Sequence, residues 1–321
     1  MRLRALLLTI AILAAAYALP AQGAAEPNRD PEKAEIVTSD IDLFWKAYDK
    51  ATQENAVIVY RDEYLKKGSE GLKEFQRLRI GSVDDLVAAI NSRPGYYKQL
   101  RAGSLTISAF KPKIRASFVR LKEIYPDSVF PPVYFVIGRM SSAGTLTEKG
   151  LLIGVDMFGK TQNTPMEELG DWHKAVISSI DRLPFIVAHE LIHYQQAQLT
   201  DGSLLAAAVR EGSADFIGEL ISGGQINPHL QEYGNARERE LWIEFEKEMS
   251  GNDRSNWLYQ GEKAKGRPAD LGYYIGFKIA ESFYKNSTDK KKAVRDILLV
   301  EDFPKFLEES KYAEKFRGVG E

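Results

Sequence analysis

The chain has 321 residues, of which 44% are hydrophobic and 27% are charged, a balance that is ordinary for a globular protein with a sizeable core. Its formal net charge of -2 at pH 7 argues against broad electrostatic binding to nucleic acid or to an anionic membrane. The chain has no cysteine, so it forms no disulfide and carries no lipid on a cysteine. Its stability must come from burial of a core.

The first residues have the pattern of an export signal. Arg2 and Arg4 precede an apolar run at residues 5–19, and small residues follow from Ala21. The run is shorter than the roughly 20 residues of a membrane span. We therefore expect residues 1–23 to be a signal peptide whose cleavage leaves no stable membrane insertion, with retention as an anchor as the alternative. The prediction is an exported protein of the bacterial periplasm or a secreted one, since a cysteine-free chain suits a bacterial envelope.

The next two segments differ in composition. Residues 24–38 are polar and contain two prolines, which is typical of a linker. Residues 39–128 show apolar side chains at helical spacing, as in Ile41, Phe44 and Trp45. This spacing predicts a helical N-terminal lobe whose aromatic side chains form core and carry no catalytic group.

Two apolar runs farther along predict buried strands. One covers residues 133–138 and the other covers residues 150–158. The segment between them, residues 141–147, is rich in Ser, Gly and Thr and predicts a loop.

The motif His189-Glu190-x-x-His193 is the most informative feature of the chain, which has four histidines in all. On a helix, the i,i+4 spacing places both imidazoles on one face, where they can share a metal ion. Glu190 is then close enough to act on water activated by that metal. The flanking residues predict a half-buried helix, since Pro184 suits a first turn and apolar residues surround the motif. The alternative is a pair of core histidines with satisfied hydrogen bonds.

Residues 203–221 predict a second helix, which carries Glu211 and, one turn later, Asp215. A catalytic zinc takes three protein ligands and keeps a position open for water, and two His with one Glu form an established set. Small residues such as Ala208 and Gly218 share the face of Glu211, so the carboxylate can approach the metal closely. Asp215 would accept the free ring N–H of a ligand histidine. An ordinary solvated helix face is the alternative.

The combination of His189-Glu190-x-x-His193 with Glu211-Gly-x-Ala-Asp215 resembles the gluzincin clan of zinc metallopeptidases, and more closely a family of predicted zinc-dependent proteases within it. The resemblance covers roughly residues 130–310. It implies that the two histidines and Glu211 bind one Zn²⁺ per chain, that Glu190 is the general base, and that Asp215 supports a histidine. The chain lacks the Gly-x-Met-x-Asn exopeptidase signature, so aminopeptidase activity is not supported.

The resemblance also implies a fold. We expect a mainly helical α+β protein, in which residues 129–321 form a zincin-like metallopeptidase domain with a small sheet bordering the active-site helix. In gluzincins a strand just before the metal helix borders the cleft. The segment 151–158 is therefore the candidate for binding an extended peptide through a free backbone edge, and a plain core strand is the alternative.

The C-terminal part predicts further helices at residues 227–250, 270–284 and 293–309. Within the second of these, the Tyr-x-x-Gly spacing of Tyr273 and Gly276 is similar to that of gluzincin aminopeptidases whose tyrosine donates to the transition-state oxygen. The resemblance thus implies a catalytic role for Tyr273, with Tyr274 as the other candidate and a core aromatic as the alternative.

The two remaining histidines lie outside the motif. His173 and His229 are expected to be surface or structural residues, and His173 is also a candidate for the rim of the cleft.

Together these patterns predict a zinc-dependent hydrolase, in the first place a peptidase that acts on a peptide or protein substrate. A zinc hydrolase of a non-peptide amide is one alternative, and a non-catalytic metal-containing envelope binding module is the other. The sequence leaves open the cleavage preference, endopeptidase versus exopeptidase action, and the oligomeric state.

Overall fold

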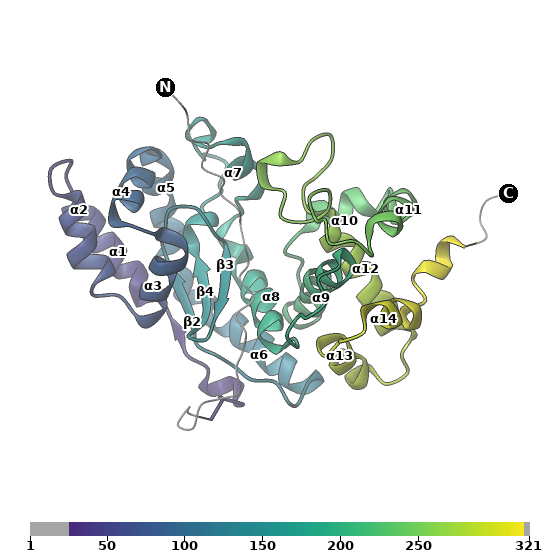
Figure 1. Cartoon of the computed structure of the whole chain (residues 1–321). Helices are drawn as coiled ribbons and strands as arrows, with labels where there is room; N and C mark the ends of the chain where they lie inside the picture. Colours follow the sequence, from purple (N-terminus) through teal and green to yellow (C-terminus); the bar gives the residue numbers. More distant parts are fainter. Residues whose placement is uncertain (1–25, 318–321) are drawn as a thin grey trace.

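A computed structural model describes residues 26–317, so the expected signal peptide lies outside the described residues. The structure is 62% helical and contains one small mixed sheet of four strands (Figure 1). This confirms the expected class, α+β and mainly helical. None of the helices within residues 26–317 combines the length and apolarity needed to cross a membrane.

Helices make up most of the described chain before residue 130. Several begin at a side chain that caps the helix, as at Ser82, whose hydroxyl and the Asp85 carboxylate satisfy each other's backbone N–H groups. Two π-helical turns, Tyr60–Leu65 and Gln76–Ile80, continue α2 and α3. The helices are α1 (Ser39–Lys50), α2 (Ala56–Val59), α3 (Glu70–Phe75), α4 (Val83–Asn91), α5 (Pro94–Ser104) and α6 (Lys111–Ile124).

The sheet has the strand order β1-β2-β4-β3. Strands β1, β2 and β4 are parallel, and β3 pairs antiparallel with β4. The strands are β1 (Ile36–Val37), β2 (Val133–Val136), β3 (Gly144–Thr147) and β4 (Gly150–Gly154). Strand β1 lies in the segment expected to be a linker.

The edge of the sheet corrects two expectations. Strand β4 was expected to present a free edge, but it pairs on both sides and all of its residues are buried. The free edge beside the later helices belongs to β3, which lies in the segment expected to be a loop. The reason is local. Gly144 and the serines before it are typical of a loop, and only three residues with strand propensity follow them, namely Thr145, Leu146 and Thr147. These residues pair with β4 through a tight hairpin.

The C-terminal part is again helical. The expected helices at 203–221 and 270–284 are confirmed, whereas those at 227–250 and 293–309 are each two helices. Asp302 and Pro304 start a new helix, because the aspartate caps it and the proline fits only its first turn. The helices are α7 (Asp171–Val176), α8 (Leu183–Gln195), α9 (Leu204–Ser222), α10 (Pro228–Asn235), α11 (Glu238–Glu248), α12 (Leu271–Asn286), α13 (Lys290–Leu298) and α14 (Phe303–Ser310).

Helix α8 lies in the middle of the molecule, with β3 and β4 on one side and α9 on another (Figure 1). Helix α9 in turn packs against α12, and the two backbones touch at Gly212 and Gly276. A Cβ atom on Gly276 would collide with the carbonyl oxygen of Ala208, so only glycine permits this crossing. The motif residues of α8 and α9 therefore lie between the edge of the sheet on one side and α12 on the other.

Candidate functional site

The two motif histidines point from one face of α8 toward the same spot. His189 is buried and His193 is nearly so, and their rings lie perpendicular with centroids 4.6 Å apart. Their Nε2 atoms are 3.0 Å apart. Helix α8 is apolar on nearly all sides, which explains why it lies between other layers and carries its polar groups inside the protein.

Helix α9 brings a carboxylate to the same spot. Oε2 of Glu211 lies 3.1 Å from Nε2 of His193 and 3.7 Å from Nε2 of His189. Helices α8 and α9 pack closely here, since a Cβ atom on Gly218 would lie in ordinary van der Waals contact with the backbone nitrogen of His189, at 3.4 Å. Within residues 26–317, these three residues form a group able to hold a metal ion.

The outer nitrogen of each ring is also held. Nδ1 of His189 lies 2.7 Å from Oδ1 of Asp215, whose Oδ2 accepts a hydrogen bond from Asn227. Nδ1 of His193 lies 2.7 Å from Oε1 of Gln196, whose amide nitrogen donates to the Arg210 carbonyl. Each Nδ1 therefore faces an acceptor oxygen, an arrangement that favours a proton on Nδ1 and frees Nε2 for a metal ion when one is bound. Asp215 occupies the supporting position that the sequence predicted, and Gln196 was missed.

The carboxylates and the histidines of this cluster change one another's pKa values. Burial disfavours the charged form of His189, but the hydrogen bond to Asp215 and the nearby carboxylates of Glu190 and Glu211 outweigh it and raise the pKa of His189 to about 9. Burial opposes ionisation of Glu211, yet the two histidines hold the pKa of its carboxyl well below the usual range. The carboxylates thus favour positive charge on His189, and the histidines favour the ionised form of Glu211.

The donor set fits zinc. A tetrahedral Zn²⁺ with bonds of about 2.0–2.1 Å has its ligand atoms roughly 3.3 Å apart, close to the three separations seen here. Two imidazole nitrogens and one carboxylate oxygen are a known catalytic zinc set, and the ring partners Asp215 and Gln196 are the kind of groups that orient metal-bound histidines.

The side chain of Glu190 projects from a different face of α8 than those of His189 and His193. It is buried, and its carboxylate packs against Gly144 of β3, where a Cβ atom would collide with Oε1. Glu190 therefore lies between the histidine cluster and the free edge of the sheet.

Tyr259 is a part of the site that the sequence did not reveal. Its hydroxyl donates to Oε1 of Glu211 at 2.7 Å, from the segment between α11 and α12. The backbone of Tyr259 has φ 58°, a conformation that is rare for a bulky residue. Reciprocal hydrogen bonds between Gln260 and Asp270 hold this segment against the start of α12. The only sequence signal is aromatic residues in a polar loop, which is too common to single out Tyr259.

The structure separates the two tyrosines of α12. The ring of Tyr273 stacks on that of His189, with centroids 6.2 Å apart and planes 20° apart. Tyr274 points away, and its hydroxyl donates to Oδ1 of Asn235 at 3.2 Å. Tyr273 thus faces the cluster while Tyr274 packs against α10. Gly276 permits the crossing of α9 and α12 and so places Tyr273.

The other two histidines lie outside the cluster. Nε2 of His173 is 3.0 Å from the carbonyl oxygen of Met140, in the segment that leads into β3, and its ring contacts Trp172. His229 is on α10, and burial lowers its pKa. Neither belongs to the group of metal-ligand atoms.

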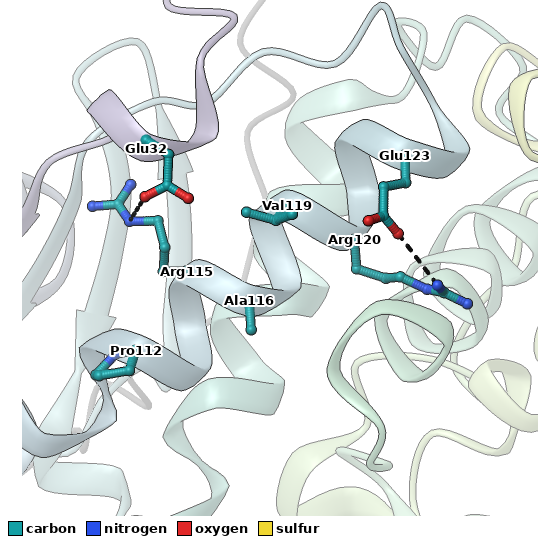
Figure 2. A pocket seen from close by; sticks show the side chains of 7 residues that line it. All are labelled: Glu32, Pro112, Arg115, Ala116, Val119, Arg120 and Glu123. Carbon is teal, nitrogen blue, oxygen red and sulfur yellow. Dashed lines mark hydrogen bonds and ion pairs between the residues drawn. The ribbon is translucent and has the colours of Figure 1, made fainter.

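A hollow on the outer face of α6 is not a competing site. Figure 2 shows the side chains that line it, which come from α6 and from Glu32. Arg115 contacts Glu32, and Arg120 contacts Glu123, so the charges there neutralise one another. The buried face of α6 separates this hollow from α8. The candidate metal ligands lie on α8 and α9, away from this hollow.

The fold and the site define a mainly helical α+β protein with a candidate metal centre of two histidines and one glutamate. Residues 172–300 match a family model described as "Predicted Zn-dependent protease (DUF2268)". The matched segment contains the three candidate metal ligands. It also contains Glu190, Asp215 and Tyr273. Comparison with curated proteins and with solved structures gave no match. The specific likeness to gluzincins stays a prediction.

Proposed function

We propose that this protein is a zinc-dependent peptidase with Glu190 as its general base. The observation that carries the proposal is the convergence of His189, His193 and Glu211 with both ring Nδ1 atoms held by acceptors. The match of residues 172–300 to a family of predicted zinc-dependent proteases supports it.

Each residue has a part in peptide hydrolysis. Zinc, when bound, supplies Lewis acidity that polarises a carbonyl and brings the pKa of water to about 7. Glu190 removes the proton from the attacking water and passes it to the leaving amine. Its contact with Gly144 fixes the carboxylate in place, so little rearrangement is needed. The hydroxyl of Tyr273 donates to the oxygen of the scissile carbonyl as negative charge develops there.

Strand β3 provides the path for the substrate. In an antiparallel pair, residues alternate between those bonded to the partner strand and those whose N–H and C=O point away. Since Gly154 donates to the carbonyl of Ala143, the outward groups belong to Gly144 and Leu146. The carbonyl of Gly144 already accepts hydrogen bonds from Oγ of Ser142 and Oγ1 of Thr145, so the N–H of Gly144 and both groups of Leu146 are the ones offered to a peptide. A peptide that pairs with this edge lies next to Glu190 and obtains main-chain hydrogen bonds. This fit to an extended chain favours a peptide over an unrelated small amide.

A peptide-library digest tests the proposal. Purified zinc-loaded protein should cleave a subset of peptides, while Glu190→Gln should retain zinc and cleave none. Loss of zinc in Glu190→Gln would reject its assignment as a base that does not bind metal. Hydrolysis of small amides without cleavage of any peptide would favour the non-peptide alternative. Zinc binding without any hydrolysis would favour the non-catalytic binding module.

A further inference from the structure

Arg79 approaches the free edge of the sheet from the side opposite to Glu190. Gly144 of β3 faces Glu190, whereas a Cβ on Gly154 would meet Ser142 and the ring of Phe75 on α3. Pairing sets Gly144 opposite Ile153, so Gly154 faces the other side of the sheet. Arg79, in the π-helical turn after α3, lies on this second side, because it contacts Thr145, which shares the face of Gly154. Figure 1 shows α3 beside the sheet.

Hydrogen bonds fix the backbone of Arg79 and the Nε atom of its side chain. Its Nε donates to Oγ1 of Thr145 on β3 at 2.7 Å. Its carbonyl oxygen accepts hydrogen bonds from Nε of Arg139 at 2.9 Å and from Oγ of Ser141 at 2.8 Å. The guanidinium is therefore held on the strand that would bind the substrate.

The outer end of the guanidinium is available for a ligand. Among the side chains that the structure describes in residues 26–317, no carboxylate lies within ion-pair distance of Arg79, and its two terminal nitrogens have no hydrogen-bond partner. Burial lowers the pKa of Arg79, and the negative charge of Glu190 opposes that effect. Arg79 is thus a partly buried cation near the catalytic carboxylate but not paired with it. Solvent reaches its two terminal nitrogens, and a negative group of a ligand can replace that solvent.

We propose that Arg79 binds a carboxylate of the substrate on the leaving-amine side of the scissile bond. The inference rests on the proposed peptidase function, because Glu190 hands its proton to the leaving amine and therefore marks that side. A peptide along β3 directs alternate side chains to the two faces of the sheet, so one position faces Arg79. The planar guanidinium suits a carboxylate, which it can bind through two parallel hydrogen bonds.

The carboxylate has two possible sources. One is the free C-terminus of a peptide that ends just after the scissile bond, and the other is the side chain of an Asp or Glu in an internal position. Three peptides separate them, built on one cleaved sequence: a neutral peptide with an amidated C-terminus, the same peptide with a free C-terminus, and an amidated peptide with Glu in place of Gln after the scissile bond.

The measurement is kcat/KM for the three peptides with zinc-loaded wild-type protein, Arg79→Gln and Arg79→Lys. Wild type should prefer one carboxylate peptide over the neutral peptide by roughly 10–100-fold, as expected for a charge-assisted contact. Arg79→Gln should abolish this preference, and Arg79→Lys should keep part of it. Arg77→Gln is the matched control, because Arg77 lies in the same turn but is exposed and pairs with Glu74. It should keep the full preference.

The outcomes separate this inference from the proposed function. Equal cleavage of all three peptides by wild type would overturn the role of Arg79 alone. An equal loss on all three peptides in Arg79→Gln would also overturn it, since that pattern belongs to a structural prop or to a group that positions Glu190. Failure of zinc-loaded wild type to cleave any peptide would overturn the proposed function as well. The wild-type comparison decides the question even where a variant does not fold.

Discussion

The hydroxyl of Tyr259 donates a 2.7 Å hydrogen bond to Oε1 of Glu211. The other oxygen of that carboxylate faces Nε2 of both histidines. Tyr259 therefore determines which oxygen is directed at the metal position. The positive φ of Tyr259 carries a conformational cost of about 1–3 kcal/mol, which the surrounding hydrogen bonds of Gln260 and Asp270 must offset.

Removing this hydroxyl should weaken the metal site. We expect Tyr259→Phe to lower zinc affinity by roughly 10–100-fold, because the ring still packs but Glu211 loses the partner that fixes its orientation. Titration of zinc-free protein in competition with a chelator measures the change, and the absorption spectrum of the cobalt-substituted protein reports altered geometry. Unchanged affinity and spectrum would show that Tyr259 has no part in positioning Glu211.

The ligand and its supporting residue should differ in their effect on metal. Glu211→Ala should nearly abolish zinc binding, because it removes one of three ligands, whereas Asp215→Ala should lower affinity by roughly 10–100-fold. Gln196→Ala should resemble Asp215→Ala, since each residue orients one histidine. Zinc content after dialysis, and competition with a chelator, distinguish the cases. Equal and full retention of zinc by all three variants would place the third ligand elsewhere.

The sequence predicted the parts of the site that follow from local geometry. The i,i+4 spacing of His189 and His193 fixes their common face once the helix is known. Glu211 and Asp215 were found because one helical turn separates them and small residues flank them. Tyr259 and Arg79 were missed, because their roles arise from contacts across 48 and 66 residues. Gln196 was missed although it is only three residues from His193, because it lies just past the last residue of α8, where helical spacing no longer predicts the direction of a side chain.

The same limit applies to the fold. Helices α9 and α12 are long and rich in apolar residues and were predicted, whereas β3 contains only four residues and begins at a glycine. Its partner β4 is so apolar that its pattern does not tell a central strand from an edge strand. The position of the free edge therefore depends on pairing, which no local pattern reveals.

Gly144 should be essential for the placement of Glu190. A methyl group at this position would collide with the Glu190 carboxylate, so Gly144→Ala should displace the base while leaving the zinc ligands in place. We expect kcat to fall by roughly 10²-fold or more, in line with the value of positioned proton transfer. Gly202→Ala is the control, because a Cβ there meets no atom within 4 Å. Full activity of Gly144→Ala with unchanged zinc content would contradict this placement.

Asp156 should make the stability of the protein depend on pH. Complete burial raises the pKa of its carboxyl to about 6, although the backbone N–H groups of Gly138 and Met140 donate to it. Since the folded pKa exceeds the unfolded value of about 3.9, the folded state binds the proton more tightly. Its stabilising contribution is present in full below pH 4 and is lost as pH rises through 6, an effect of about 3 kcal/mol.

Asp156→Asn isolates this contribution. The difference in free energy of unfolding between zinc-free wild type and Asp156→Asn should shift in favour of the variant between pH 4 and pH 7, because the amide does not ionise. Urea unfolding at several pH values measures it, and comparing two zinc-free proteins avoids the pH dependence of metal binding. A difference that stays constant over this range would mean that Asp156 keeps its ordinary pKa in the folded state.

The two tyrosines of α12 allow a matched test of the transition-state donor. Tyr273 stacks on His189 and faces the candidate metal position, whereas the hydroxyl of Tyr274 is bonded to Asn235 on α10. Tyr273→Phe keeps the ring and removes the donor, so kcat should fall by roughly 10²–10³ with KM and zinc content unchanged, as for loss of an oxyanion donor. Tyr274→Phe should lower stability slightly and leave kcat near that of wild type, because its hydroxyl serves packing between helices. A normal kcat for Tyr273→Phe together with a large loss for Tyr274→Phe would reverse the assignment, and normal turnover in both would leave the negative oxygen without a tyrosine donor.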